Sequence, residues 1–319
     1  MRILVTGGAG FIGSHLVDHL CRAYPGATVV TFDKLTNAAS RATLAELARH
    51  KNHVFVRGDV ANPEDVEPVF RNGVDVVFHL AAESHVDRSI ATPGDFVRTN
   101  VFGTYCVLEM ARRYDVQKVV VVSTDEVYGP IEQGAADEDA PLLPSSPYAA
   151  SKAGGDLLCR AYVRTYRLPV VLTRCTNNYG PRQHPEKLIP KAILCALEDR
   201  PIPLYGDGAQ RRDWLYVEDH CRALEAAMAK GEAGDVFHIA AGEERTNREV
   251  AEAVLRLLGR DPSHVVHVPD RPGHDRRYAL DDRRTRRRLG WAPRVSFAEG
   301  LARTVAWYRR HRDWWTCGC

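Results

Sequence analysis

The chain has 319 residues, of which 45% are hydrophobic and 26% charged, a composition typical of a globular protein with one large α/β domain and a smaller lobe. Its 43 basic and 41 acidic residues leave a net charge of +2, which argues against nucleic acid or a membrane surface as a partner. No apolar run has the length of a membrane span, no leader-like segment precedes the first strand, and the eight cysteines lack zinc or disulfide spacing. We therefore expect a cytoplasmic protein with a frayed tail at Cys317 and Cys319.

A short apolar strand is predicted over residues 1–6, and a glycine-rich turn follows it. The turn reads GGAGFIG, with Gly7, Gly10 and Gly13 ahead of a segment with helical apolar spacing over 14–24. Close approach of the backbone to a ligand needs residues without a Cβ, and the start of the helix offers free N–H groups to a pyrophosphate. This turn is therefore predicted to bind a dinucleotide.

Asp33 indicates which dinucleotide binds. It ends a second apolar strand over 28–32 and lies 20 residues after Gly13, where an acid accepts a hydrogen bond from the ribose 2′-hydroxyl of NAD. Its charge would repel the 2′-phosphate of NADP, although the neighbouring Lys34 weakens that argument. We expect NAD as the cofactor.

Strands and helices continue to alternate along the chain. Apolar strands are predicted over 54–56, 74–80 and 119–122, with helices over 66–72 and 99–114 between them. Asp59 is placed beside an adenine pocket, while Ala81 and Ala82 let a cofactor lie against the backbone. The alternation predicts a doubly wound parallel sheet of the Rossmann type. We expect an NAD-binding domain over 1–175 and a smaller C-terminal α/β substrate lobe over 176–319, with some later chain returning to the sheet.

Asp125 and Glu126 stand at the carboxyl end of the fifth predicted strand, where open α/β sheets place their chemistry. Neighbouring residues of a strand point to opposite faces, so both acids reach one substrate only if the strand ends there. On these residues alone, a turn with two solvated acids is an equally good interpretation.

Tyr148 and Lys152 begin a predicted helix and are four residues apart, which places the phenol and the ammonium on one helix face. We expect the ammonium to lower the pKa of the phenol towards neutrality and to hold a cofactor ribose, so that Tyr148 can act as a base. Farther along, Arg212 and Arg271 are candidates for binding a diphosphate, since planar bidentate donors suit phosphate. Structural ion pairing is the competing interpretation of these arginines.

Seven stretches together resemble the extended short-chain dehydrogenase/reductases and, within them, the dTDP-glucose 4,6-dehydratases. They are TGGAGFIGSH, AAESHVDRSI, STDEVYG, SPYAASKAG, NNYGPRQHPEKLIP, GDGAQRRDWLYVEDHCRA and RPGHDRRYALD, and the resemblance runs to about residue 310. It implies a lyase with tightly bound NAD that removes water from a nucleoside-diphosphate hexose, with dTDP-glucose as the first choice of substrate. It also implies a homodimer packed through the helices at 99–114 and 148–166.

The resemblance assigns roles to individual residues. Tyr148, Lys152 and Thr124 would carry the redox steps, Glu126 would remove the C5 proton, and Asp125 would protonate the leaving 6-hydroxyl. The implied NAD contacts are Gly7, Gly10, Phe11, Ile12, Gly13, Asp33, Lys34, Leu35, Thr36, Asp59, Val60, Leu80, Ala81, Ala82, Glu83, Thr99, Tyr148, Lys152 and Asn178. The implied sugar-nucleotide contacts are Ser84, Thr124, Asn177, Lys187, Leu188, Tyr205, Arg212, Asn247, Arg271 and His274.

Two loops depart from the family pattern. Asn37-Ala38-Ala39-Ser40 stands where Tyr-Ala-Gly-Asn is usual, and Arg182-Gln183-His184 replaces a more aromatic loop. The first departure lies near the cofactor and the mouth of the site, so it bears on NAD retention or substrate fit.

Three rival functions stay open. A 4-epimerase needs Tyr148 and NAD but no paired acid and base, and a nucleotide-glucuronate decarboxylase often carries Ser where Asp125 stands. A non-catalytic NAD-sensing protein is the alternative from another class, and it would have no need of the Tyr148–Lys152 pair. Whether the substrate carries thymidine or uridine, and which hexose it contains, also stays open.

Overall fold

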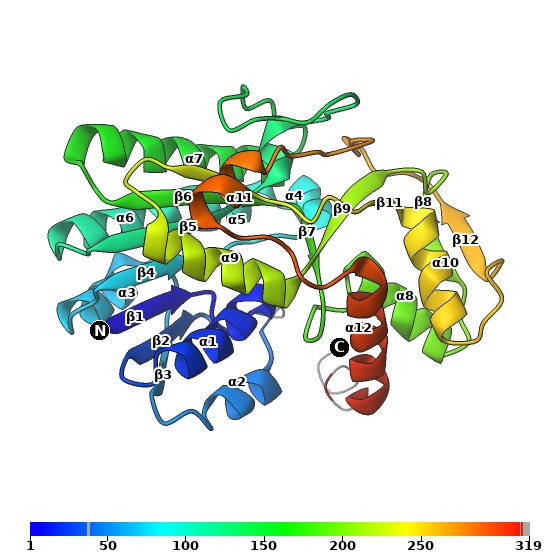
Figure 1. The fold of residues 1–319 in the computed structure, drawn as a ribbon, viewed down its shortest axis with the longest axis horizontal. Helices are drawn as coiled ribbons and strands as arrows, with labels where there is room; N and C mark the ends of the chain where they lie inside the picture. The colour runs from blue at the N-terminus through cyan, green and yellow to red at the C-terminus, as the bar shows by residue number, and fades with distance from the viewer. Residues whose placement is uncertain (37–38, 313, 315–319) are drawn as a thin grey trace.

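The main body of the computed structural model, which describes residues 1–36, 39–312 and 314, is a parallel sheet of seven strands (Figure 1). Their order across the sheet is β10-β6-β5-β4-β1-β2-β3. The order reverses between β1 and β4, and such a point opens a crevice for a ligand at the carboxyl ends of the strands. The strands are β1 (Arg2–Thr6), β2 (Thr28–Asp33), β3 (His53–Arg57), β4 (Val76–His79), β5 (Lys118–Thr124), β6 (Val170–Cys175) and β10 (Val236–Ile239).

Helices cover both faces of this sheet (Figure 1). Successive strand side chains point to opposite faces, so Ile3 and Val5 join one core cluster while Leu4 joins the other. The first face carries α1 (Phe11–Ala23), α2 (Arg41–Leu47), α9 (Val217–Lys230) and α11 (Arg283–Leu289), and the second carries α3 (Pro63–Arg71), α6 (Gly103–Arg113) and α7 (Pro147–Tyr166). The predicted doubly wound parallel sheet is confirmed.

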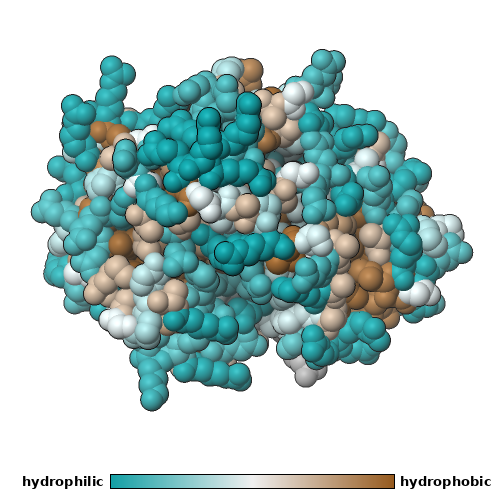
Figure 2. Space-filling model, in the orientation of Figure 1, coloured by the Kyte–Doolittle hydropathy of each residue, from teal (hydrophilic) through white to brown (hydrophobic). Residues whose placement is uncertain are grey.

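A smaller lobe packs beside the sheet, at the right of Figure 1. Its core gathers aromatic side chains, among them Tyr179, Trp214, Phe297 and Tyr308. A groove between α10 and α12 is lined by apolar and charged residues and opens on the face shown in Figure 2. The elements of the lobe are β7 (Asn177–Tyr179), α8 (Leu188–Leu197), β8 (Ile202–Tyr205), β9 (Arg211–Tyr216), β11 (Glu244–Thr246), α10 (Asn247–Leu257), β12 (Val265–Val268) and α12 (Phe297–Arg310).

The helix predicted over 99–114 is present, but its first residues have π-helical rather than α-helical geometry. After α4 (Val86–Ala91) and α5 (Pro93–Phe96), the chain makes a π-helical segment, η1 (Val97–Phe102), before α6 begins. Asn100 in this segment donates its side-chain Nδ2 to the Glu83 carbonyl and accepts the Glu83 N–H at Oδ1, both at 2.9 Å. The wider turn therefore ties the helix to the loop after β4, which apolar spacing alone does not reveal.

None of the helices within residues 1–36, 39–312 and 314 is long and apolar enough to cross a membrane. The predicted frayed tail at Cys317 and Cys319 falls outside the described residues.

Candidate active site

The glycine turn after β1 is built for close backbone contact. Gly7 has a φ of +71°, and a Cβ there would lie 2.7 Å from the Ala81 backbone nitrogen. A Cβ on Gly13 would lie 2.1 Å from the Gly7 carbonyl oxygen. Gly10 precedes the first residues of α1, Phe11 and Ile12, and has no side chain to cap their N–H groups. The start of α1 is thus left to bind an anionic ligand.

Asp33 lies at the end of β2 and is tied to the same turn. Its Oδ2 accepts the Ala9 N–H at 3.1 Å, and its Oδ1 accepts the Leu35 N–H at 2.8 Å. Burial raises the pKa of this carboxyl, while these two hydrogen bonds and the Lys34 charge lower it. Each carboxylate oxygen has a further lone pair, so Asp33 can also accept a ligand hydroxyl.

The Lys34 ammonium lies among acids at the edge of this region. Its Nζ is 3.3 Å from Glu83 Oε1, 3.9 Å from Asp59 Oδ2 and 3.4 Å from Thr99 Oγ1. Two carboxylates already balance its charge, so it offers little extra attraction to a 2′-phosphate. The remaining predicted cofactor residues of this region line the loops after β2, β3 and β4: Leu35, Thr36, Val60, Leu80, Ala81 and Ala82.

The strand β5 ends just before Asp125 and Glu126, so the two acids are not held on opposite faces of the sheet. β5 stops at Thr124, and the two acids begin a 3₁₀ turn, η2 (Asp125–Tyr128). Thr124 Oγ1 caps this turn by accepting the Glu126 N–H at 3.3 Å, and it donates to Asp125 Oδ1 at 3.1 Å. Asp125 is only 3% exposed, and Glu126 is partly buried, so the alternative interpretation of two solvated acids in a turn is wrong.

The environment gives the two acids different proton affinities. Burial first, and then the Glu126 charge, raise the pKa of Asp125 to about 8, against the lowering effect of Arg212 and Thr124. Burial also raises the pKa of Glu126, but the charges of Arg212, Arg271 and Lys187 oppose that rise. Asp125 therefore holds a proton at neutral pH, beside a Glu126 that faces three cations.

Tyr148 and Lys152 lie on the first turns of α7 and face the same region. Lys152 donates from Nζ to the Val122 carbonyl oxygen at 2.7 Å, and the Thr124 side chain acts to lower the pKa of Tyr148. The expected lowering of the Tyr148 pKa is wrong for the protein alone, because burial and the Glu126 charge raise that pKa well above its ordinary value. Burial also lowers the pKa of Lys152, whose ammonium is turned towards a carbonyl rather than the phenol.

The loop after β4 and the smaller lobe meet across the mouth of the site. Lys187 donates from Nζ to the Ser84 carbonyl at 2.8 Å, and the Tyr205 hydroxyl donates to Asp87 Oδ2 at 2.9 Å. Arg271 Nη1 is 3.5 Å from Asp87 Oδ1. Three other predicted substrate residues stand at the first position of an element: Asn177 begins β7, Leu188 begins α8 and Asn247 begins α10. The His274 ring packs edge-on to the Tyr205 ring.

The two predicted phosphate-binding arginines differ in what they already bind. Arg212 is buried and donates from Nη2 to the Asp275 carbonyl at 2.9 Å and from Nη1 to the Arg211 carbonyl at 2.7 Å. Arg271 Nε, by contrast, is buried without a hydrogen-bond partner in the described part of the chain. Of the two, Arg271 has the free buried donor that an incoming anion can satisfy.

Comparisons with known proteins agree with this geometry. The family model for GDP-mannose 4,6 dehydratase matches residues 4–304. A dTDP-glucose 4,6-dehydratase from Streptomyces niveus is 52% identical over 319 residues, covering 99% of this chain and 95% of the relative. The crystal structure of DesIV, a dTDP-glucose 4,6-dehydratase from Streptomyces venezuelae with NAD and TYD bound, has a TM-score of 0.97 at 53% identity, with both chains fully covered. The chain belongs to the GDP-mannose 4,6-dehydratase family.

The fold of this dehydratase family is shared with enzymes of other activities. A UDP-glucose 4-epimerase from Thermotoga maritima, solved with UDP-glucose, has a TM-score of 0.90 at 34% identity and covers 97% of this chain and 99% of its own. The fold therefore leaves the reaction to be argued from the site residues.

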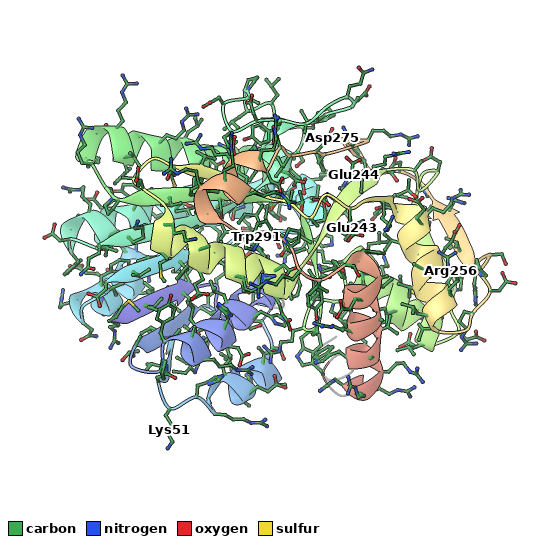
Figure 3. The ribbon with its side chains drawn as sticks, viewed as in Figure 1. Lys51, Glu243, Glu244, Arg256, Asp275 and Trp291 are labelled. Carbon is green, nitrogen blue, oxygen red and sulfur yellow. The ribbon has the colours of Figure 1, made fainter. Side chains whose placement is uncertain are left out.

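Two residues that the sequence argument missed lie against the predicted site. The Tyr278 hydroxyl donates to Asp275 Oδ2 at 3.0 Å and lies 3.5 Å from Glu126 Oε2, while its ring lies 4.3 Å from the Arg212 guanidinium carbon. Asp275 lies in the loop between β12 and α11, which crosses from the smaller lobe to the large sheet (Figure 3). Tyr278 and Asp275 belong to the family-like stretch RPGHDRRYALD, and Asp87 belongs to AAESHVDRSI. Their position in these stretches was the only sign in the sequence that they lie near the site.

Of the two loops that depart from the family pattern, the structure describes Arg182-Gln183-His184 in full and only the end of the loop at 37–40. Arg182 Nη2 is 2.6 Å from Glu46 Oε2 on α2, and Gln183 donates from Nε2 to the Asn178 carbonyl at 2.8 Å. The Asn178 side chain is itself held by the His220 ring, with Oδ1 2.9 Å from Nδ1. Asn37 and Ala38 lie outside the described residues.

Proposed function

We propose that the chain is an NAD-dependent hydro-lyase that converts dTDP-glucose to dTDP-4-keto-6-deoxyglucose. The observation that carries this proposal is the Asp125–Glu126 pair: Asp125 is buried and accepts the Thr124 hydroxyl, and both acids lie close enough to Tyr148 to raise its pKa. The relatives named dTDP-glucose 4,6-dehydratase, at about half identity over nearly the whole chain, support this choice of nucleotide sugar.

NAD fits the site after β1. The glycine turn and the start of α1 can bind its pyrophosphate, and Asp33 can accept a hydrogen bond from its ribose. When bound, NAD accepts a hydride from C4 of the sugar, returns it to C6, and carries positive charge in its oxidised form. DesIV, which this chain matches over its full length, was solved with NAD bound.

The residues then divide the chemistry into two halves. In the first half, Tyr148 as phenolate takes the proton of the sugar 4-hydroxyl. The Thr124 side chain acts to lower the pKa of Tyr148, and Lys152 lies one helical turn away. The resulting 4-keto group acidifies the proton on C5.

In the second half, Glu126 removes the C5 proton and Asp125 protonates the 6-hydroxyl, which leaves as water. Glu126 then returns a proton to C5 as the hydride reaches C6. The raised pKa of Asp125 and the cations around Glu126 suit these opposite roles. Asp125 Oδ2 is buried without a partner in the described part of the chain, so it is free to meet the 6-hydroxyl. We assign Arg271 and Arg212 to the diphosphate.

The same pair argues against the rival reactions. An epimerase of the same fold performs no elimination and has no use for a protonated acid beside a base. A decarboxylase releases carbon dioxide and needs no proton donor for a leaving oxygen. The intact pair of Tyr148 and the buried Lys152 on α7 likewise disfavours a non-catalytic sensor.

We further infer the organisation of the protein. We assign residues 1–175 to an NAD-binding domain and 176–319 mainly to the substrate domain, with β10, α9 and α11 packed on the large sheet. We propose a cytoplasmic homodimer formed through η1, α6 and α7. Exposed apolar side chains on these helices support that interface: Val97, Phe102, Tyr105, Leu157 and Tyr166.

The proposal is tested with dTDP-glucose in deuterated water. The expected product is a 4-keto-6-deoxy sugar with deuterium at C5, because Glu126 exchanges its proton with solvent before returning one to that carbon. Mass spectrometry and proton NMR locate the label. The matched control is Glu126→Gln, which should accumulate reduced NAD without releasing the deoxysugar. An epimerised, unlabelled hexose from the native protein would reject the dehydratase function.

A further inference from the structure

The loop that joins β7 to α8 contacts two helices that pack on the large sheet. The Pro181 carbonyl accepts a hydrogen bond at 2.9 Å from Nε2 of His15, on α1. The next residue, Arg182, has its Nη2 2.6 Å from Glu46 Oε2, on α2. One loop of the smaller lobe therefore ties both helices.

Both helices belong to the predicted NAD site. His15 lies one turn after Phe11 and Ile12, the first residues of α1, whose N–H groups are left to bind the pyrophosphate. Glu46 lies on α2, which follows the predicted ribose ligand Asp33 after a short stretch of chain. Because a short stretch of chain has a limited reach, the position of α2 constrains the ribose end of the site.

The same loop also contacts a third part of the predicted cofactor site. Gln183 is 8% exposed and donates from Nε2 to the Asn178 carbonyl, on β7, at 2.8 Å. Asn178 is itself a predicted NAD contact. Three successive residues, 181 to 183, thus each bind a different element of the site, and Arg182 is the one that does so through charge.

Arg182 is held in an unusual backbone conformation. Its φ is +64°, in the left-handed region that a residue with a Cβ rarely adopts unless surrounding contacts fix it. Its side chain is 16% exposed and that of Glu46 is 34% exposed, so solvent screens the ion pair only in part. Burial, followed by the Arg182 charge, lowers the pKa of His15 to about 4, so this ring is neutral at neutral pH and does not repel the guanidinium.

We propose that Arg182 is a positioning residue for NAD: its ion pair with Glu46 holds α2 to the smaller lobe and slows release of the cofactor. The proposed reaction returns the hydride to the sugar, so one NAD can serve many turnovers if it stays bound. Arg182 belongs to a loop that departs from the family pattern, so this ion pair is not part of that pattern. The inference rests on the proposed function only in taking NAD as the bound cofactor.

The test measures NAD release without any sugar nucleotide. Protein loaded with NAD is diluted into excess alcohol dehydrogenase and ethanol, which reduce each released NAD, and the absorbance of the reduced form is followed. Arg182→Gln and Glu46→Gln should each release NAD about threefold to fivefold faster than the native protein, the size expected for a lost ion pair with partly exposed side chains. Arg182→Lys keeps the charge and should stay near the native rate.

The matched control is Glu225→Gln, which breaks a similar contact on the same helix. Glu225 Oε2 lies 2.7 Å from His19 Nε2 on α1, with 29% and 28% of the two side chains exposed. Tyr24, beyond the last residue of α1, also donates to Glu225 at 2.9 Å, so this contact lies toward the end of α1 opposite the glycine turn. We expect Glu225→Gln to release NAD at the native rate.

The double variant Arg182→Gln/Glu46→Gln shows whether the two side chains act through each other. Release no faster than in either single variant would support the ion pair, whereas multiplied effects would overturn the proposal. Native rates in both single variants, or equal acceleration in Glu225→Gln, would overturn it as well.

The melting temperature of the NAD-free variants checks that they fold. Trp314 Nε1 also donates to Thr43 Oγ1 on α2, at 3.2 Å, so α2 keeps a second tie to the smaller lobe when the ion pair is lost. If Arg182→Gln melts early, Glu46→Gln and Arg182→Lys carry the test. Formation of the deoxysugar tests the proposed function, while NAD release requires no sugar nucleotide, so the two proposals can fail separately.

Discussion

The floor and the rim of the candidate site are built in different ways. We call the floor the buried polar cluster beneath η2, formed by Tyr128, Asp156, Arg174 and His238. Arg174 is fully buried and donates from Nε to Asp156 Oδ2 at 2.9 Å. It also donates to the Tyr128 hydroxyl, which lies 2.6 Å from His238 Nε2. The other ring nitrogen of His238 lies 3.0 Å from the Asp281 carbonyl, so this nitrogen carries the ring proton and Nε2 accepts. The floor thus fixes the turn that carries both acids.

The rim is the set formed by Asp87, Tyr205, Arg271 and His274, where the smaller lobe meets the loop after β4. Its ion pair is longer and partly solvated: Arg271 Nη1 lies 3.5 Å from Asp87 Oδ1, with 20% and 37% of the two side chains exposed. A buried network of this kind holds one geometry, whereas a solvated rim can adjust to a ligand. We infer that the floor sets the chemistry and the rim sets substrate affinity.

The largest predicted effect lies at the acid that the floor holds. Asp125→Asn keeps the size of the side chain but cannot supply the elimination proton, so we expect turnover to fall by about 10² to 10⁴. Oxidation to the 4-keto stage should persist, because Tyr148 and Lys152 are unchanged. Single-turnover absorbance of reduced NAD measures the first step, and product formation measures the second. If reduced NAD no longer forms, the division of roles between the two halves is wrong.

The next effect concerns stability and contrasts the floor with an exposed pair in the smaller lobe. Arg174→Met leaves Asp156 buried without its partner, and breaking such a pair typically costs about 3 to 5 kcal/mol of unfolding free energy. The matched control is Arg276→Gln, since the side chains of Arg276 and Asp207 are both 54% exposed and solvent screens such a pair, so the loss of stability should be far smaller. Urea unfolding measures both. If both variants lost the same free energy of unfolding, the buried floor would be no more important for stability than the exposed pair.

The pH dependence follows from Asp125. The elimination needs this acid protonated, and its pKa is raised to about 8, so the rate should be flat below that pH and fall tenfold per unit above it. The sign for stability is the same: with a folded pKa above the ordinary 3.8, the contribution of Asp125 is full below pH 3.8 and is lost as pH rises through about 8. The decay of reduced NAD in single turnovers reports the rate. Asp125→Asn should lose this alkaline limb, and a limb that persists there would assign it to another group.

Sequence reasoning predicted the dinucleotide site, the acid-base residues and most of the rim residues, but none of the four residues of the floor. Alternating strands, the glycine turn and Asp33 predict the sheet and its dinucleotide site, because strand ends and helix starts are fixed by local spacing. The proximity of Asp125, Glu126 and Tyr148 follows from the same strand order. The pKa of Tyr148 could not be predicted, since it depends on burial and on where the Lys152 ammonium points.

Contacts between segments far apart in the chain could not be predicted from the sequence. Asp87 meets Tyr205 and Arg271, which follow it by more than a hundred residues, and no local pattern specifies that meeting. Tyr278 reaches Glu126 only because the loop between β12 and α11 returns across the site. Motif membership marks such residues as candidates, but their partners come from packing alone.

The smallest predicted effect is at the rim. Asp87→Asn can still accept the Tyr205 hydroxyl but no longer attracts Arg271, so the guanidinium is freed to approach or leave a diphosphate. Because this contact lies outside the acid-base pair, we expect KM for dTDP-glucose to change by about threefold to tenfold, the range of an exposed or half-buried charge pair, while kcat stays near the native value. Steady-state kinetics at several salt concentrations measures both constants. A matched fall in kcat would place Asp87 in the machinery of the reaction, and the separation of floor from rim would then have to be redrawn around the loop after β4.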